Sequence, residues 1–422
     1  MVLKSYCEVM LIFQCTKESA KVGDLQFGWI DFSNDQRNKV MSVISLLSEP
    51  DAVDELGIGM VRDGFSNIFF PGTSTIQTRA KYFLLTSYLL VELEKQKGMT
   101  PDKLIKQLNH EELNMIEILK SEGEKGIIGE NAGKKLKRKP SDIYWNGLRS
   151  YGIFTGGKIS LHEYAKITCR LNHKKHEILA FGNMKDKTED VVGDDQDAYL
   201  HDFSGGFWRL PNLSSNWKEN LTIHLDFEEA LFLKNRIIMS YPDTMLGEVL
   251  EKNVEEFCMC NSFNELEAIM HKFSEPIQYD FHLAKSFSDF ILGAQLRYNA
   301  ILSKGKDNDV IDDWKEWHED IDKYCNIDLS EILVSRLEIK NFRLIKFLTE
   351  CQNAMKSNHI DRLDEILIGR ECQLKGNNRS KLYNASEFNY ENWTGMGRLQ
   401  YRFRNGQNII KDIFEGIGDA NA

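Results

Sequence analysis

Three hydroxyl residues, Thr73–Thr75, and then two cations follow a Pro-Gly pair at residues 71–72, in a pattern that suits phosphate binding. The Pro-Gly pair ends a predicted helix whose apolar residues recur three and four positions apart. Thr73 and Ser74 can cap a second helix, whose first turns carry Arg79 and Lys81. Free N–H groups and the positive end of the helix dipole attract anions there. We therefore expect these four side chains to contact a phosphate of nucleic acid or nucleotide.

A structural interpretation of the same residues stays open. The hydroxyls can be ordinary helix caps, and Arg79 can pair with a carboxylate such as Asp63. The segment contains no GxxxxGK[ST] pattern, so a P-loop is not predicted.

A second candidate is the basic run Lys134–Lys139, which includes Lys135 and Arg138. Such a run can contact phosphates, and the aromatic helix that follows it, which carries Arg149, can enter a groove of DNA. The outline of helix, basic turn and short helix resembles a winged helix. The alternative is a solvated basic loop.

The third candidate lies between Arg370 and Arg404, where cations outnumber carboxylates and aromatic residues are interleaved with them. Arginine suits bidentate phosphate contacts, and exposed aromatic rings can stack on unpaired bases. We single out Arg379, Arg398 and Arg402. The alternative is a helical cap in which the aromatic rings pack inward and the arginines pair with acidic residues.

Neither a metal site nor a catalytic site is predicted. The acidic groups at 190–202 and 312–318 are typical of a solvated loop and a charged helix surface. The eight cysteines form no CxxC pair, which favours reduced thiols. We expect no cofactor and no metal, and a non-enzymatic role.

Composition limits the partners. The formal net charge of the 422-residue chain is −11, so any contact with nucleic acid must use local basic patches. The longest apolar run, Tyr82–Val91, is well short of the roughly 20 residues that span a bilayer. No membrane partner is expected, and we expect the protein to be cytoplasmic.

The hydrophobic pattern predicts a mainly α, multi-helical protein with a short N-terminal strand over Gln26–Phe32 and winged-helix-like segments. We expect an N-terminal helical domain over 1–155, an irregular polar connection over 156–225 and a C-terminal helical domain over 226–422. In the last, helices are predicted over Phe227–Ile238, Thr244–Cys258, Phe263–His271, Phe281–Leu302, Asp309–Asp322, Ser330–Leu337, Phe342–Met355 and Ile360–Gly369.

Several segments resemble an uncharacterised bacterial family, a domain of unknown function. They are Gly28–Ser33, Asp54–Gly59, Phe70–Phe83, Ile143–Leu148, Arg379–Leu382 and Trp393–Arg402. The resemblance covers nearly the full chain. It implies a link to components of bacterial anti-phage islands, sometimes beside helicases and phospholipase-D-like nucleases, and it supplies no catalytic residues.

The sequence therefore leads to the expectation of a nucleic-acid-binding, non-enzymatic component of an anti-phage defence system. Its expected partners are nucleic acid, DNA first, and helicase or nuclease proteins. Two alternatives stay open: a nuclease or nucleotide-processing enzyme with an unrecognised site, and a protein–protein adaptor without affinity for nucleic acid.

Overall fold

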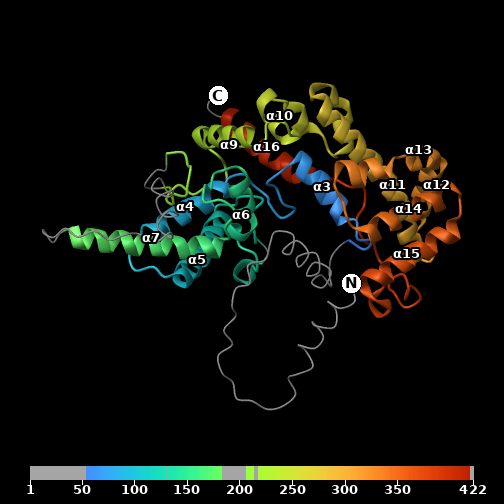
Figure 1. The fold of residues 1–422 in the computed structure, drawn as a ribbon, viewed down its shortest axis with the longest axis horizontal. Coiled ribbons are helices and arrows are strands. Elements are labelled where there is room, and N and C mark those ends of the chain that lie inside the picture. Colours follow the sequence, from blue (N-terminus) through green and yellow to red (C-terminus); the bar gives the residue numbers. More distant parts are fainter. Residues whose placement is uncertain (1–53, 131, 183–205, 213–216, 419–422) are drawn as a thin grey trace, which may run out of the picture. The chain divides into compact units, whose positions relative to one another are not determined.

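The computed structural model describes residues 54–130, 132–182, 206–212 and 217–418 (Figure 1). The chain divides into two compact units, Met1–Ala52 and Val53–Ala422, and the described residues belong to the second. The strand predicted over Gln26–Phe32 lies outside them. Among the described residues every regular element is helical, which confirms the mainly α class.

The first half of the described chain contains one group of helices that surround a buried one. They are α3 (Gly59–Phe69), α4 (Tyr82–Glu94), α5 (Pro101–Ser121), the short 3₁₀ helix η1 (Gly133–Lys135), α6 (Pro140–Ser150) and α7 (Leu161–Gly182). Helix α4 is buried at every position from Tyr82 to Leu90, and α5, α6 and α7 pack against it. An apolar helix needs neighbours on all sides, and these three supply them.

In the described part of the second half, every regular element is again a helix. They are α9 (Phe227–Ser240), α10 (Met245–Lys252), η2 (Glu255–Met259), η3 (Asn264–Lys272), α11 (Glu275–Leu302), α12 (Asn308–Glu319), α13 (Ile321–Cys325), η4 (Glu331–Arg336), α14 (Phe342–Lys356), α15 (Ile360–Lys375), η5 (Asn377–Arg379) and α16 (Phe403–Gly418). Local sequence signals explain where several of these helices begin or end. Helix α9 starts with a capping box between Asp226 and Glu229, and α10 ends at Asn253, whose φ of 50° is left-handed.

Packing crosses the predicted domain limits at 155 and 225. Helix α3, from the first predicted part, packs against α10 and α11 of the last part. One buried apolar cluster extends from Leu56 to Ile413. The three-part division stays a prediction, but residues from its first and last parts share this cluster.

The winged-helix expectation was wrong for the described residues. A wing is a β-hairpin, whereas the segment after α6 forms one isolated antiparallel bridge, Phe154 with Trp208. The rings of Trp145, Phe154, Tyr164 and Trp208 pack together there, with centroids 4.7 Å to 6.2 Å apart. Aromatic burial therefore draws this segment inward instead of leaving it free to form a wing.

The second helix of the Pro-Gly unit starts later than expected. Helix α4 begins at Tyr82, and residues 71–81 form irregular turns. Thr73 does not cap α4, whose N-cap position is Lys81 and has no side-chain cap; the Thr73 hydroxyl donates to the carbonyl of Phe70 at 2.6 Å. Gly72, with a φ of 78°, lies so close to the ring of Tyr151 that a Cβ atom would approach it to 2.7 Å. The turn therefore depends on glycine in both conformation and space.

The backbone of this irregular segment is satisfied from elsewhere in the fold. The buried Tyr144 hydroxyl on α6 accepts from the N–H groups of Thr78 (3.0 Å) and Arg79 (3.2 Å) and donates to the Arg79 carbonyl (2.8 Å). Buried N–H groups need such partners when no helix supplies them.

Replacing Tyr144 by Phe tests this account. Tyr144→Phe keeps the ring but leaves two N–H groups without an acceptor, so we expect a loss of about 3 kcal/mol in the free energy of unfolding, measured by urea denaturation. The exposed Tyr383→Phe is the matched control. Equal stabilities of the two variants would contradict the role given to Tyr144.

Candidate functional site

Arg79 makes a buried ion pair with the last helix. Its Nε donates to both carboxylate oxygens of Asp412 on α16, at 2.8 Å and 3.0 Å, and the N–H of Ala80 donates to the same carboxylate at 2.6 Å. Asp412 is 6% exposed. Burial raises the pKa of Asp412, while Arg79 acts in the opposite direction. The guanidinium therefore joins α16 to the start of α4 and does not face solvent as a free phosphate ligand.

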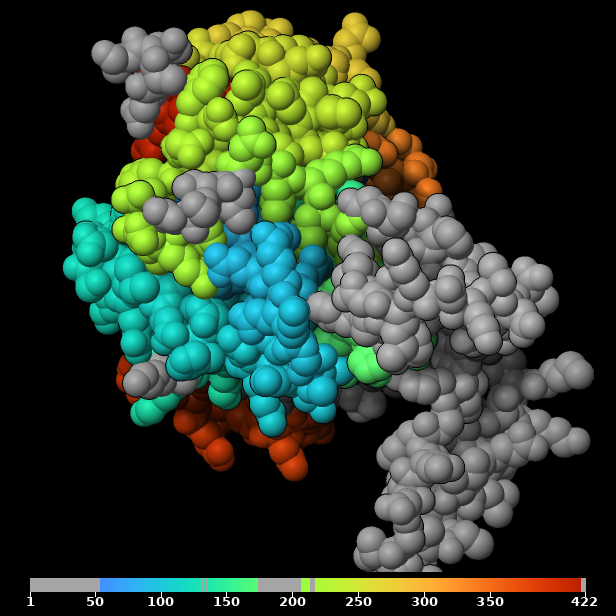
Figure 2. Space-filling view, turned by 90° about the vertical axis from the view of Figure 1, so that its left-hand side faces the viewer, coloured from blue at the N-terminus to red at the C-terminus, as the bar shows by residue number. Residues whose placement is uncertain are grey.

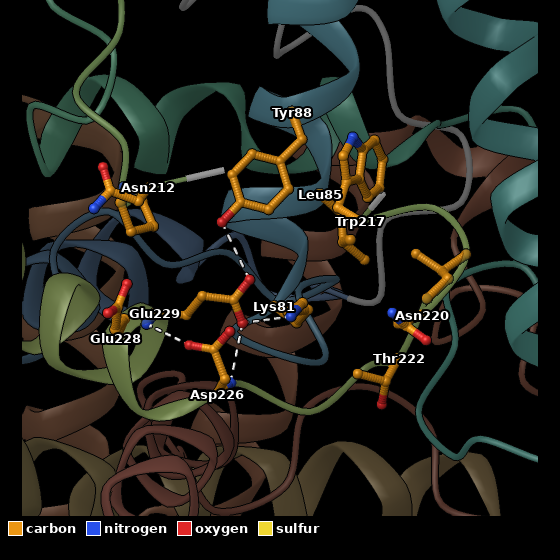
Figure 3. Close-up of a pocket in the computed structure, with 12 residues that line it drawn as sticks. Lys81, Leu85, Tyr88, Asn212, Trp217, Asn220, Thr222, Asp226, Glu228 and Glu229 are labelled. Carbon is orange, nitrogen blue, oxygen red and sulfur yellow. Dashed lines mark hydrogen bonds and ion pairs between the residues drawn. The ribbon is translucent and has the colours of Figure 1, made fainter. Parts of the chain in front are cut away.

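Lys81 lies at the base of a pocket and pairs there with Glu229, the first-turn carboxylate of α9 (Figure 3). Both side chains are buried. Glu229 also accepts from the Tyr88 hydroxyl at 3.1 Å and from the N–H of Asp226 at 3.0 Å. Burial and the neighbouring Glu229 raise the pKa of Tyr88 far above its usual value, so it stays a neutral donor.

The pocket above this pair has a volume of about 240 Å³. We call it the acidic pocket. Its lining residues are Lys81, Leu85, Tyr88, Pro211, Asn212, Trp217, Asn220, Leu221, Thr222, Asp226, Glu228 and Glu229. These residues include three carboxylates, those of Asp226, Glu228 and Glu229, and one ammonium group, that of Lys81. The acidic pocket therefore has a net negative charge, which opposes the binding of phosphate.

The segment 217–229 is held against α4 and α5 by polar contacts. The indole N–H of Trp217 donates to Glu92 at 2.6 Å, and Lys218 pairs with Glu92 and, at 3.4 Å, with Glu111. In Figure 2 the yellow-green atoms of this part of the chain lie against the blue and cyan atoms of α4 and α5. One wall of the acidic pocket is thus fixed by side-chain contacts.

The basic run leaves three cations exposed. Lys135, Lys137 and Arg138 are exposed, and none of them forms an ion pair with a described residue. We call these three residues the basic turn. Lys139 differs, because its ammonium donates to the carbonyl of Leu136.

The N-terminus of α6, which follows the basic turn, is already occupied. The N–H and hydroxyl of Ser141 donate to the carboxylate of Glu112, at 2.5 Å and 3.0 Å, and Glu112 is fully buried on α5. Burial raises the pKa of Glu112 to about 8. This carboxyl occupies the place that a phosphate would take at the start of the predicted DNA-reading helix.

Arg149 and most of the C-terminal cations also have internal partners. Arg149 donates to the carbonyl of Ile159 at 3.3 Å. Arg398 pairs with Asp289 on α11. Arg402 donates at 2.9 Å to Asn67 and to the carbonyl of Thr73.

Arg379 is the one predicted C-terminal residue that is exposed and has only a backbone partner among the described residues. It donates to the carbonyl of Lys375 at 3.0 Å. Ser74 is half-buried, and its hydroxyl oxygen has no hydrogen-bond partner in the described part of the chain. The structure brings Arg402 against Thr73, whereas Arg79 and Lys81 are paired with carboxylates of other helices. Lys135, Arg138, Arg379 and Arg398 are the predicted cations that are exposed, and of these Arg398 is paired with Asp289.

Sequence reasoning missed the carboxylates that engage the buried cations. Asp412 lies 333 residues from Arg79, and Glu229 lies 148 residues from Lys81. The spacing of Asp226 and Glu229 does signal a capping box, but it carries no information about Lys81. In the described residues no group of His, Cys, Asp or Glu side chains could hold a metal ion. The acidic group at 190–202 lies outside the part that the structure describes.

Fold and site define a helical protein with an acidic pocket and a separate basic turn. A family model described as a family of unknown function, DUF6361, matches residues 25–351, so the chain belongs to that family. No curated protein and no solved structure matches the chain. Among the described helices, none has the length and apolar character that crossing a bilayer requires.

Asp412→Asn tests the ion pair that joins α16 to α4. The substitution keeps the shape of the side chain but leaves Arg79 without its counter-charge, so we expect about 3 kcal/mol of destabilisation in urea. Glu415→Gln, which removes an exposed carboxylate on the same helix, should cost little. Similar midpoints of urea unfolding for the two variants would show that the Arg79–Asp412 pair does not stabilise the fold.

Glu112 makes stability depend on pH. Its pKa of about 8 in the folded protein lies above the ordinary 4.5, so across this interval the folded state holds a proton that the unfolded state has lost. The contribution of Glu112 to the free energy of unfolding is greatest below about pH 4.5. It is lost as the pH rises towards 8, by up to about 1.4 kcal/mol per pH unit. Glu112→Gln should therefore flatten the pH profile of thermal unfolding. The exposed Glu122→Gln should leave the profile unchanged; parallel profiles for wild type and Glu112→Gln would refute this assignment.

Proposed function

We propose that the protein is a non-enzymatic, nucleic-acid-binding component that acts with partner proteins. The observation that supports this proposal is the basic turn, whose three cations are exposed and lack ion pairs within the described residues. In a chain of net charge −11, binding to a polyanion requires such a local concentration of positive charge.

The basic turn supports contacts with the phosphate backbone more than the reading of bases. Lysine and arginine on a short turn can follow phosphates, whereas sequence reading requires side chains that enter a groove. Because Glu112 occupies the N-terminus of α6, we do not assign that helix to a groove. We expect weak, salt-dependent binding with little sequence preference, to DNA first.

The cellular setting belongs to the proposal as well. We place the protein in the cytoplasm of a bacterium, in an anti-phage defence system with a helicase or nuclease partner. Support for this setting comes from the sequence resemblance alone.

A second candidate function, a protein-binding adaptor, is favoured by an open groove of about 450 Å³ beside α11 and α12. The rings of Trp317, Tyr324 and Trp393 line it together with exposed carboxylates such as Asp313 and Glu316. Aromatic faces and carboxylates both attract cations, so a lysine- or arginine-rich segment of a partner protein fits this groove.

The basic turn can be tested by its effect on salt dependence. The triple variant Lys135→Ala, Lys137→Ala and Arg138→Ala should bind duplex DNA more weakly than wild type. The slope of log K against log salt should fall by about 3, since each phosphate that a cation neutralises adds roughly 0.9 to it. Fluorescence anisotropy at several salt concentrations measures both effects.

The control removes three exposed cations from other helices and loops: Lys323, Lys340 and Lys346. It should leave affinity and slope unchanged, although it alters the net charge equally. Identical decreases in the two triple variants would show that only net charge matters and would reject the basic turn as a site. Cleavage of the DNA in the presence of magnesium would favour the enzyme alternative, and absence of binding at low salt would favour the adaptor.

A further inference from the structure

The acidic pocket has features that the nucleic-acid role does not use. Its lining combines the buried Lys81–Glu229 pair, apolar and aromatic side chains, and the exposed carboxylates of Asp226 and Glu228 (Figure 3). We propose that this pocket binds a small organic amine, a molecule with one ammonium group and a flat apolar body.

The charge of the ligand follows from the carboxylates that remain unused. Lys81 neutralises Glu229, so this pair contributes no net charge. Asp226 uses one carboxylate oxygen to accept from the N–H of Glu229 at 2.9 Å, and its other oxygen has no partner among the described residues. Glu228 is exposed and has no partner there either. Two carboxylates thus remain for a cation, and an anion would meet uncompensated repulsion.

The flat apolar body follows from the aromatic wall. The rings of Tyr88 and Trp217 lie 5.5 Å apart at an angle of 59°, beside the buried Leu85. Both rings are held in place, because the Tyr88 hydroxyl donates to Glu229 and the Trp217 indole donates to Glu92. A preorganised aromatic wall favours stacking of a flat group and attraction of an ammonium group.

The volume of the acidic pocket argues against a folded protein partner, and the hydrogen bonds of Glu229 argue against a metal ion. At about 240 Å³ the cavity lies just below the usual range for drug-sized ligands, so it suits a small molecule and is too small for a folded partner. A metal ion requires several converging oxygen ligands, whereas both oxygens of Glu229 already accept from Lys81, Tyr88 and the backbone. An organic amine needs only the two exposed carboxylates, those of Asp226 and Glu228.

The test is a charge series on one ring system, measured by titration calorimetry on the full chain. Tryptamine is cationic, tryptophol is neutral and indole-3-acetate is anionic. We expect tryptamine to bind about tenfold more tightly than tryptophol, and indole-3-acetate to bind most weakly.

The variants separate charge from shape. Asp226→Asn keeps the helix cap, because asparagine caps as well as aspartate does, and Glu228→Gln keeps the side-chain length. Together they should remove the preference for tryptamine over tryptophol. Glu275→Gln removes an exposed first-turn carboxylate from α11 and is the matched control, so it should leave the preference unchanged.

Trp217→Leu should weaken all three ligands, since it removes the surface on which the indole ring stacks, and should weaken tryptamine most, since its ammonium group also loses the attraction of the ring. Thermal unfolding followed by circular dichroism checks that each variant is folded. Equal affinity of wild type for the three ligands, or a preference that survives the double variant, would overturn the proposal. None of these measurements depends on the basic turn, so the result is independent of the nucleic-acid assignment.

Discussion

The arrangement of the described helices depends on the ion pair between Arg79 and Asp412. The segment 71–81 is not helical, so its backbone groups need partners from other elements. Asp412 supplies one by accepting from the N–H of Ala80 while it neutralises Arg79. Because α16 also packs against α9 and α10, this carboxylate connects the second half of the chain to the start of the buried helix α4. A buried pair of this kind is strongly destabilised when one partner is removed.

The same requirement explains why so few of the basic residues are free. Arginine and lysine side chains that lie between packed helices must find carboxylates or carbonyl oxygens, because burying an unpaired charge is costly. Arg79, Lys81 and Arg402 all follow this rule. Other lysines and arginines stay exposed on helix surfaces and in turns, and the basic turn places three of them close together in the sequence.

The two proposed binding regions therefore differ in charge and in construction. The basic turn is an exposed stretch of cations without a cavity, which suits a long polyanion bound weakly through its backbone. The acidic pocket is a fixed cavity whose carboxylates and aromatic rings suit a small cation. A surface that attracts a polyanion repels a cation, and the reverse also holds. A protein of net charge −11 therefore needs two separate regions for the two proposed ligands.

The sequence by itself determined the helical class and many helix positions, because a buried helix face repeats every three to four residues. Val61, Phe65 and Phe69 are spaced in this way and are buried on α3, and the Asp226 cap fixes where α9 begins. Only the tertiary structure decided which cations are unpaired among the described residues, and that the described residues after α6 form an isolated bridge in place of a wing. Helical spacing is a local property of the backbone, whereas the pairing of Arg79 with a carboxylate 333 residues away depends on which helices meet.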